Sequence, residues 1–204
     1  MSTLEEVKQC ALDAKESIWE QAKAYDRDPK IYLHWSAGTY DNHSDHYHVC
    51  IDGEGGLHIM HPDMSDVVQG TWKRNSGSVS IAMSGCYGAG SNGLGDYPPT
   101  EAQIEAMAQC IQVIADALDL TIDKNHVLTH GEAANNEDGD ERWHRPYAWW
   151  NDSYGDGDTR GDLEYLGTKD SPSYNPEATD GTRGGDVERG KANFYRNKAR
   201  GEEQ

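Results

Sequence analysis

Apolar residues recur at the spacing of an α-helix in three stretches of the chain. The first stretch covers residues 2–25, the second residues 100–118 and the last about residues 187–198, and each gathers its apolar positions on one face. Thr100 and Gln103 have the spacing of a capping box, which satisfies backbone N–H groups at a helix start. The pattern therefore predicts a helix near each end of the chain and one between them.

Short runs of alternating apolar and polar positions lie between these helices and predict β-strands. The runs are residues 31–35, 47–51, 57–60, 78–83 and 127–130. Two of them carry a histidine at or near the carboxyl end, His34 and His130, just before small residues that break the strand. Ligands of α/β sheets often gather at such strand ends. The pattern predicts an α/β fold in which helices flank a mixed central β-sheet.

The composition narrows the classes of function. The 204 residues carry a formal net charge of −18, which argues against nucleic-acid binding because phosphates need a basic face. No run of about 18 apolar residues occurs, so we expect no contact with a membrane. The first residues are acidic and lack a basic segment followed by an apolar one, so we expect no signal peptide and synthesis in the cytoplasm. The four cysteines match no metal-binding spacing, and we expect reduced, half-buried thiols.

The two strand-end histidines suggest a metal site. A catalytic zinc ion takes three protein ligands and keeps one open position for water. His34 and His130 would supply two of the three ligands. The third would come from the polar segment that follows, where the candidates are Glu141, His144, Asp158 and Asp162.

A calcium loop is the alternative interpretation of the acidic segment. Asp156, Asp158 and Asp162 are spaced like positions 1, 3 and 7 of an EF-hand loop. Arg160 stands at position 5, where that loop needs an oxygen ligand. The match is therefore incomplete, and the zinc interpretation is favoured.

Several motifs of the chain occur in the order and spacing of a known family. They are residues 32–38 (YLHWSAG), 47–49 (YHV), 72–75 (WKRN) followed by 78–82 (SVSIA), and 128–134 (LTHGEAA). On these motifs the chain resembles the zinc-dependent N-acetylmuramoyl-L-alanine amidases, the superfamily of phage amidase endolysins and peptidoglycan-recognition proteins. The resemblance covers about residues 31–166 and continues more weakly into the last helix.

The resemblance implies a set of zinc ligands. They fall on His34, His130 and Asp162, the last within a Thr-Arg-Gly-Asp segment. His144 is the alternative third ligand, because the family often has Arg-Trp-Asp and the only Arg-Trp of this chain is followed by His144. Asp162 is favoured because more of the surrounding positions match the family.

Further roles follow from the same resemblance. Tyr47 and Arg160 would stabilise the oxyanion of a tetrahedral intermediate, and Glu132 would orient His130. Some relatives carry a glutamate where this chain has Met83, which leaves the general base unassigned. We expect the other histidines at the surface or in a substrate groove: His43, His46, His48, His58 and His61. Three tryptophans would either stack on substrate or pin the long loop to the core: Trp143, Trp149 and Trp150.

The activity that the resemblance implies is zinc-dependent hydrolysis of the amide between N-acetylmuramic acid and L-alanine in peptidoglycan. It implies one catalytic domain over residues 1–204, with no separate cell-wall-binding domain. Its parts would be an N-terminal helix within residues 1–28, a long irregular loop region at residues 135–185 and a C-terminal helix at residues 186–199. An endolysin-like enzyme of this kind would reach the wall after release from the cytoplasm. Two alternatives remain: a non-catalytic peptidoglycan-binding module of the same fold, and a zinc amidase or peptidase that acts on another peptide.

Overall fold

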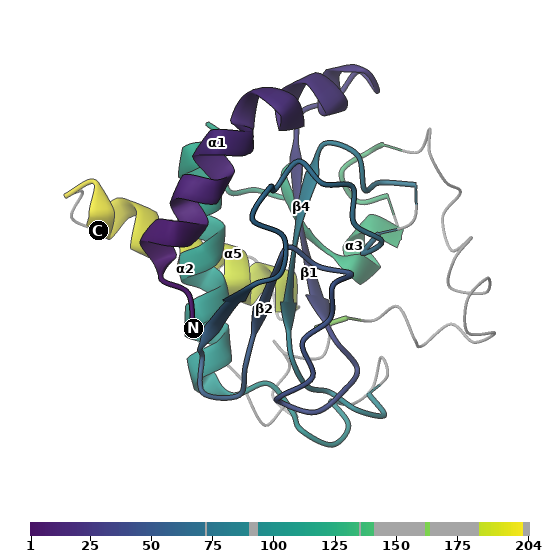
Figure 1. Ribbon diagram of the computed structural model, residues 1–204, viewed down its shortest axis with the longest axis vertical. Coiled ribbons are helices and arrows are strands. Elements are labelled where there is room, and N and C mark those ends of the chain that lie inside the picture. Colours follow the sequence, from purple (N-terminus) through teal and green to yellow (C-terminus); the bar gives the residue numbers. More distant parts are fainter. Residues whose placement is uncertain (72, 90–93, 135, 141–161, 164–183, 202–204) are drawn as a thin grey trace.

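The computed structural model describes residues 1–71, 73–89, 94–134, 136–140, 162–163 and 184–201, and the elements below belong to this part of the chain. Its centre is a five-stranded sheet in the order β3-β2-β4-β1-β5 (Figure 1). The strands are β1 (Lys30–Trp35), β2 (Val49–Ile51), β3 (Leu57–Ile59), β4 (Ser78–Met83) and β5 (Val127–Thr129). β1 runs parallel to its neighbours β4 and β5, and β3 is antiparallel to β2. The predicted mixed sheet is confirmed.

Helices cover the sheet on both sides. They are α1 (Leu4–Lys23), α2 (Glu101–Ala117), α3 (His130–Ala134) and α5 (Gly184–Ala199). α2 packs between α1 and α5, and Figure 1 shows α1 and α2 side by side on one side of the sheet, with α3 on the other. The predicted α/β class is therefore confirmed, whereas the organisation as one domain over residues 1–204 stays a prediction. Among the described helices, none is long and apolar enough to cross a bilayer.

Element boundaries differ from the predicted ones by a few residues. The sequence allows two capping boxes for the first helix, and the structure forms the one between Thr3 and Glu6. The predicted box between Thr100 and Gln103 is present at α2. β2 begins at Val49, two residues later than expected, and the last helix begins two residues earlier than residue 186.

The alternation in β1 sends its side chains to two different buried regions. Ile31, Leu33 and Trp35 join the large hydrophobic core that α1 and α2 cover. Tyr32 packs instead in a small cluster with Leu128 and Ala133, on the side of α3. Because alternate residues of a strand share a face, His34 lies on the same face as Tyr32. This explains why the whole strand is buried: it is a central parallel strand with both faces covered.

The cysteines take no part in cross-links. All four are free thiols, as expected. Cys50, Cys86 and Cys110 are fully buried, however, so the expectation of half-burial is wrong for these three. Burial raises the pKa of the Cys50 thiol to about 11, which makes it an inert packing residue at neutral pH.

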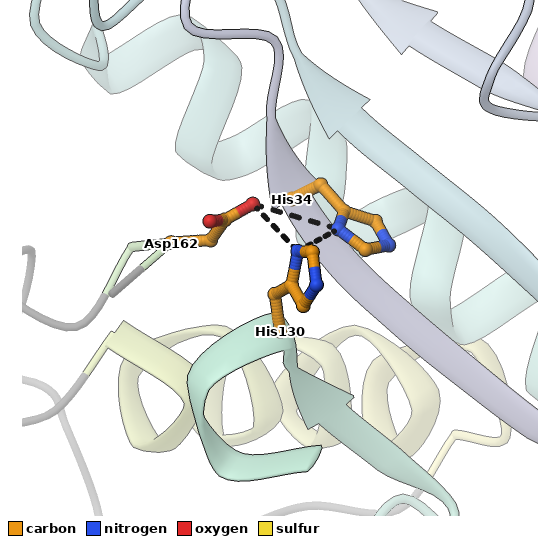
Figure 2. A group of neighbouring side chains, drawn as sticks. All are labelled: His34, His130 and Asp162. Atoms are coloured by element: carbon orange, nitrogen blue, oxygen red, sulfur yellow. Dashed lines mark hydrogen bonds and ion pairs between the residues drawn. The ribbon is translucent and has the colours of Figure 1, made fainter. Parts of the chain in front are cut away.

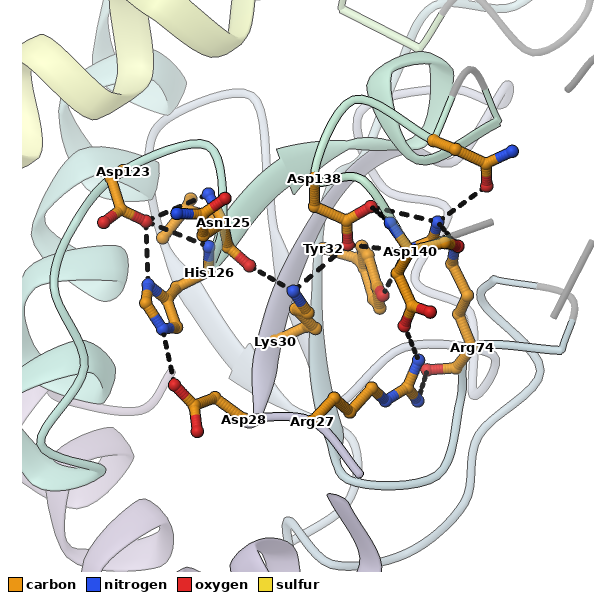
Figure 3. A network of polar contacts seen from close by, with 12 residues as sticks. Arg27, Asp28, Lys30, Tyr32, Arg74, Asp123, Asn125, His126, Asp138 and Asp140 are labelled. Carbon is orange, nitrogen blue, oxygen red and sulfur yellow. Dashed lines mark hydrogen bonds and ion pairs between the residues drawn. The ribbon is translucent and has the colours of Figure 1, made fainter. Parts of the chain in front are cut away.

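A buried polar network ties the amino end of β1 to the segment after α3 (Figure 3). Its centre is Arg74, whose side chain has no exposed surface. The guanidinium donates to both carboxylate oxygens of Asp138, at 2.7 and 3.2 Å, and to the Asn136 side chain at 2.8 Å. It also donates to the Tyr32 hydroxyl at 3.3 Å. Arg74 thereby connects its own segment, residues 73–77, to strand β1 and residues 136–140.

Asp138 is the main anionic partner in this network. Lys30, the first residue of β1, contributes a second cation with its Nζ 3.1 Å from Asp138 Oδ2. Burial alone would raise the pKa of Asp138, but Arg74 and Lys30 lower it to about 2. The carboxylate therefore stays ionised in the interior, because two cations and several hydrogen bonds offset its lost hydration.

Candidate metal centre

Three predicted ligands meet at the carboxyl end of β1 (Figure 2). His34 is the penultimate residue of β1, and His130 is the first residue of α3, directly after β5. Because β1 and β5 are adjacent and parallel, their ends bring the two imidazoles together. Asp162 reaches the same point from a segment far along the chain. One donor atom from each of the three residues lies within 4.8 Å of the others.

The spacing of these donor atoms suits a tetrahedral metal ion. The two Nδ1 atoms of His34 and His130 are 3.1 Å apart. Asp162 Oδ2 lies 3.5 Å from the first and 3.3 Å from the second. Two ligands of a tetrahedral zinc ion, each about 2.0 Å from the metal, are separated by about 3.3 Å. Two imidazole nitrogens and one carboxylate also form a donor set that catalytic zinc uses and that calcium and magnesium do not favour.

The two histidine rings keep Asp162 anionic despite its burial. All three side chains are almost completely buried. Burial alone would raise the pKa of Asp162, but the adjacent His130 and His34 rings lower it far below the ordinary range. Asp162 Oδ2 also accepts a hydrogen bond from the backbone N–H of Trp35, at 3.3 Å. The carboxylate is thus attached to the residue that follows His34, which fixes the third donor relative to the first.

Thr71 orients the His34 ring. The far ring nitrogen, Nε2, lies 3.2 Å from the hydroxyl oxygen of Thr71. If Nδ1 is to present a lone pair to a metal, Nε2 must carry the proton, and the Thr71 hydroxyl oxygen can accept a hydrogen bond from that N–H. The Thr71 backbone N–H donates in turn to the Asn75 side chain at 2.6 Å. The Thr71 contact is therefore compatible with the ring tautomer that a metal needs.

Tyr47 lies against one candidate ligand, His34, and its predicted role stays a prediction. Its ring packs on the His34 ring with 5.0 Å between centroids. Its hydroxyl donates to the Trp35 carbonyl at 3.2 Å. Tyr47 is half-buried.

The Glu132 side chain bonds to Thr129 and Arg189, away from the three candidate donor atoms. Its backbone N–H donates to Thr129 Oγ1 at 3.1 Å, and its carboxylate accepts from the Thr129 N–H at 2.9 Å. These reciprocal bonds have the form of a capping box, and they enclose His130 in the first turn of α3. The carboxylate also pairs with Arg189 of α5. Glu132 thus acts on the backbone that carries His130, and its predicted role in orienting the ligand stays a prediction.

Other candidates lie outside the described residues. They are the third-ligand alternative and its acidic neighbours, the predicted oxyanion cation and the three loop tryptophans: Glu141, His144, Asp156, Asp158, Arg160, Trp143, Trp149 and Trp150. Met83, at the position where some relatives carry a glutamate, is fully buried in the large core at the end of β4. It offers no proton-transfer group, so the general base stays unassigned.

The expectation that the remaining histidines lie at the surface or in a groove is wrong for His48. Its side chain is fully buried, where Nδ1 accepts from the Ser80 N–H at 3.0 Å and Nε2 donates to the Asp66 carbonyl at 2.9 Å. The first bond attaches His48 to β4, and the second attaches it to the loop that carries Asp66. His43 and His58 are half-buried and stack on each other with 4.0 Å between ring centroids.

Burial lowers the pKa of His48 to about 4, and this predicts a loss of stability in acid. The folded state binds the proton more weakly than the unfolded chain, whose histidine titrates near 6.5. The contribution of His48 is therefore fully present above pH 6.5 and is lost as the pH falls towards 4. Between pH 7 and pH 4, the free energy of unfolding of His48→Asn should fall by about 3 kcal/mol less than that of the unmodified chain.

Urea unfolding at a series of pH values measures this difference. His46→Asn is the matched control, because His46 is exposed two residues away. An unchanged pH dependence in His48→Asn would show that the buried imidazole does not set the acid limit.

Sequence reasoning missed several residues that support this centre. Thr71 and Arg189 were not singled out, and Arg74 appeared only as a letter in a motif. Each acts through a partner between 37 and 64 residues away, so no local pattern could reveal it. In the sequence each is only a charged or polar residue in a turn or helix. Such residues ordinarily lie at the surface, so nothing marked these three as buried.

Comparisons with known proteins place the chain in a family. A family model described as N-acetylmuramoyl-L-alanine amidase matches residues 14–144, more than half of the chain. Among solved structures, the Ph2119 endolysin of the Thermus scotoductus MAT2119 bacteriophage Ph2119 is similar with 18% identity and a TM-score of 0.41, over 52% of this chain and 73% of that one. No curated protein matches. The family match spans β1 with His34 and β5 with the turn at His130, and on that extent the chain belongs to the N-acetylmuramoyl-L-alanine amidase family.

Proposed function

We propose that this chain is a zinc-dependent amidase that hydrolyses the bond between N-acetylmuramic acid and L-alanine in bacterial peptidoglycan, and so degrades the cell wall. The observation that carries the proposal is the convergence of His34, His130 and Asp162 in a member of this family. The three donors have the number, type and spacing of a catalytic zinc site.

The chain would hold zinc through the two Nδ1 atoms and the Asp162 carboxylate. Bound there, zinc would activate a water molecule near neutral pH and polarise the amide carbonyl. The residues around it would keep the donors aligned: Thr71 would accept a hydrogen bond from a protonated His34 Nε2, and the Trp35 N–H donates to Asp162. The metal centre therefore has its orienting partners in place.

Tyr47 is the described residue best placed to meet developing charge. Its ring lies on His34, and its hydroxyl, which donates to the Trp35 carbonyl, would have to turn from that carbonyl to donate to a substrate. A donor fixed beside the reacting carbonyl stabilises the negative oxygen of a tetrahedral intermediate. We assign this role to Tyr47, with the positive charge of Arg160 as a second stabilising group and with Glu132 holding the turn that carries His130. The net charge of −18 means that local contacts, not overall attraction, would bind an anionic wall.

Digestion of purified peptidoglycan tests the proposal. We expect mass spectrometry of the products to show new L-alanine amino termini and glycan strands freed of stem peptide. A chelator should stop the reaction, and zinc but not calcium should restore it. Cleavage between sugars or within the stem peptide would contradict the proposed bond, and binding without cleavage would indicate a recognition module.

A further inference from the structure

The first turn of α5 lies directly against the segment that carries Asp162. A Cβ atom placed on Gly184 would lie 1.8 Å from the carbonyl oxygen of Leu163, the residue after Asp162. Leu163 is fully buried in the large core. Only glycine permits this approach, because any larger residue would push the backbone next to Asp162 away.

The next residue of α5 touches the turn that carries His130. A Cβ atom on Gly185 would lie 2.0 Å from Glu132 Oε1. Glu132 and Thr129 exchange hydrogen bonds on either side of His130. The Glu132 carboxylate therefore helps to fix the backbone of the turn that carries His130. Because Gly185 has no side chain, it leaves room for that carboxylate.

Arg189, one turn further along α5, holds that carboxylate in place. Its guanidinium donates to both Glu132 oxygens, at 2.9 and 2.8 Å, and to the Val127 carbonyl of β5 at 2.8 Å. Asp186 accepts a fourth bond at 2.9 Å. All of these side chains are buried. A two-pronged arginine–carboxylate pair fixes direction as well as distance, which a simple apolar contact does not.

We infer that Gly184, Gly185 and Arg189 form a clamp that positions His130 and Asp162 relative to each other. We call these three residues the α5 clamp. They are positioning residues: they touch no donor atom, but they set the backbone on which two of the three donors stand. The inference rests on the proposed metal-binding role of the site. It means that the C-terminal helix sets metal affinity in addition to covering the core.

A comparison of two buried arginines on the same helix tests the clamp. Arg196 matches Arg189 in burial, donates to the Leu120 carbonyl at 2.9 Å and pairs with Asp116, but contacts neither ligand segment. Arg189→Met and Arg196→Met should both lower the melting temperature. Only Arg189→Met should also weaken zinc binding, by about 10- to 100-fold, the usual loss when a partner of a ligand is removed. Arg189→Lys should fall between, because lysine cannot engage both oxygens.

Zinc affinity is measured by competition with a chromophoric chelator, at a temperature where circular dichroism shows every variant folded. Gly184→Ala is the second variant, since it removes no charge and displaces only the backbone beside Asp162; it should weaken zinc binding in the same way. Equal zinc affinities in Arg189→Met and Arg196→Met, or an unchanged affinity in Gly184→Ala, would overturn the clamp. An unmodified chain that binds zinc but releases no L-alanine termini would refute the proposed function and leave the clamp to be judged on affinity alone.

Discussion

Asp162→Asn should lower zinc affinity by more than about 100-fold and abolish peptidoglycan hydrolysis. The amide keeps the shape of the carboxylate and can still accept the hydrogen bond from Trp35 N–H. It is uncharged, however, and a neutral amide oxygen is a poor zinc ligand. Only the two imidazoles of His34 and His130 would then bind the ion firmly. The loss of zinc affinity therefore measures the contribution of the negative charge of Asp162, because the packing of its segment is unchanged.

His144→Ala is the decisive comparison, because His144 is the alternative third ligand. We expect this variant to keep both its zinc content and its activity. Zinc content is measured by plasma emission after dialysis, and activity by the release of L-alanine amino termini. Loss of zinc in His144→Ala with retention in Asp162→Asn would reassign the third ligand to His144.

The second large effect concerns stability. Arg74→Met should lower the free energy of unfolding by about 3–5 kcal/mol, the range found when one partner of a buried ion pair is removed. Methionine leaves Asp138 in the interior with Lys30 as its remaining cation. It also removes the donors to Asn136 and Tyr32. For a chain of this length, the melting temperature should fall by about 10 °C.

Two controls separate the buried charge from the loss of side-chain volume. Arg74→Met combined with Asp138→Asn should recover part of the lost stability, because the stranded carboxylate is then absent. Lys15→Met breaks an exposed ion pair with Asp119 and should cost less than about 1 kcal/mol. Thermal unfolding followed by circular dichroism measures all four proteins. A cost for Arg74→Met no larger than that for Lys15→Met would contradict the central role of the network.

The sheet and two of the three donors could be predicted from local patterns. Strand β1 shows the period-two alternation that places His34 and Tyr32 on one face, and the short apolar run before His130 shows a second strand. Parallel neighbours end at the same edge of a sheet, so two strand-end histidines imply proximity. The capping boxes follow from residue spacing alone, which made helix starts accurate to within two residues.

Local patterns could not identify contacts made over long sequence separations. The choice among acidic candidates for the third ligand came from resemblance, since nothing near Asp162 shows that it accepts from Trp35 N–H, 127 residues away. His48 looks like one more member of a polar, histidine-rich loop, and its burial depends on the Asp66 carbonyl. Arg74 and Arg189 resemble surface charges because their acidic partners lie 64 and 57 residues away. In each case the partner residue is distant in the sequence, and only the fold of the chain brings the two together.

The three donors also determine how a bound metal ion would affect the chain as a polymer. His34 and His130 are 96 residues apart, and Asp162 lies a further 32 residues along. An ion that ties these points together closes two loops, as a pair of cross-links would. Closing such loops restricts the unfolded chain, so part of the binding free energy appears as folding free energy. The metal would then act as a cross-link between the first strand and the last third of the sequence. Its removal would lower the stability of the fold as well as stop hydrolysis.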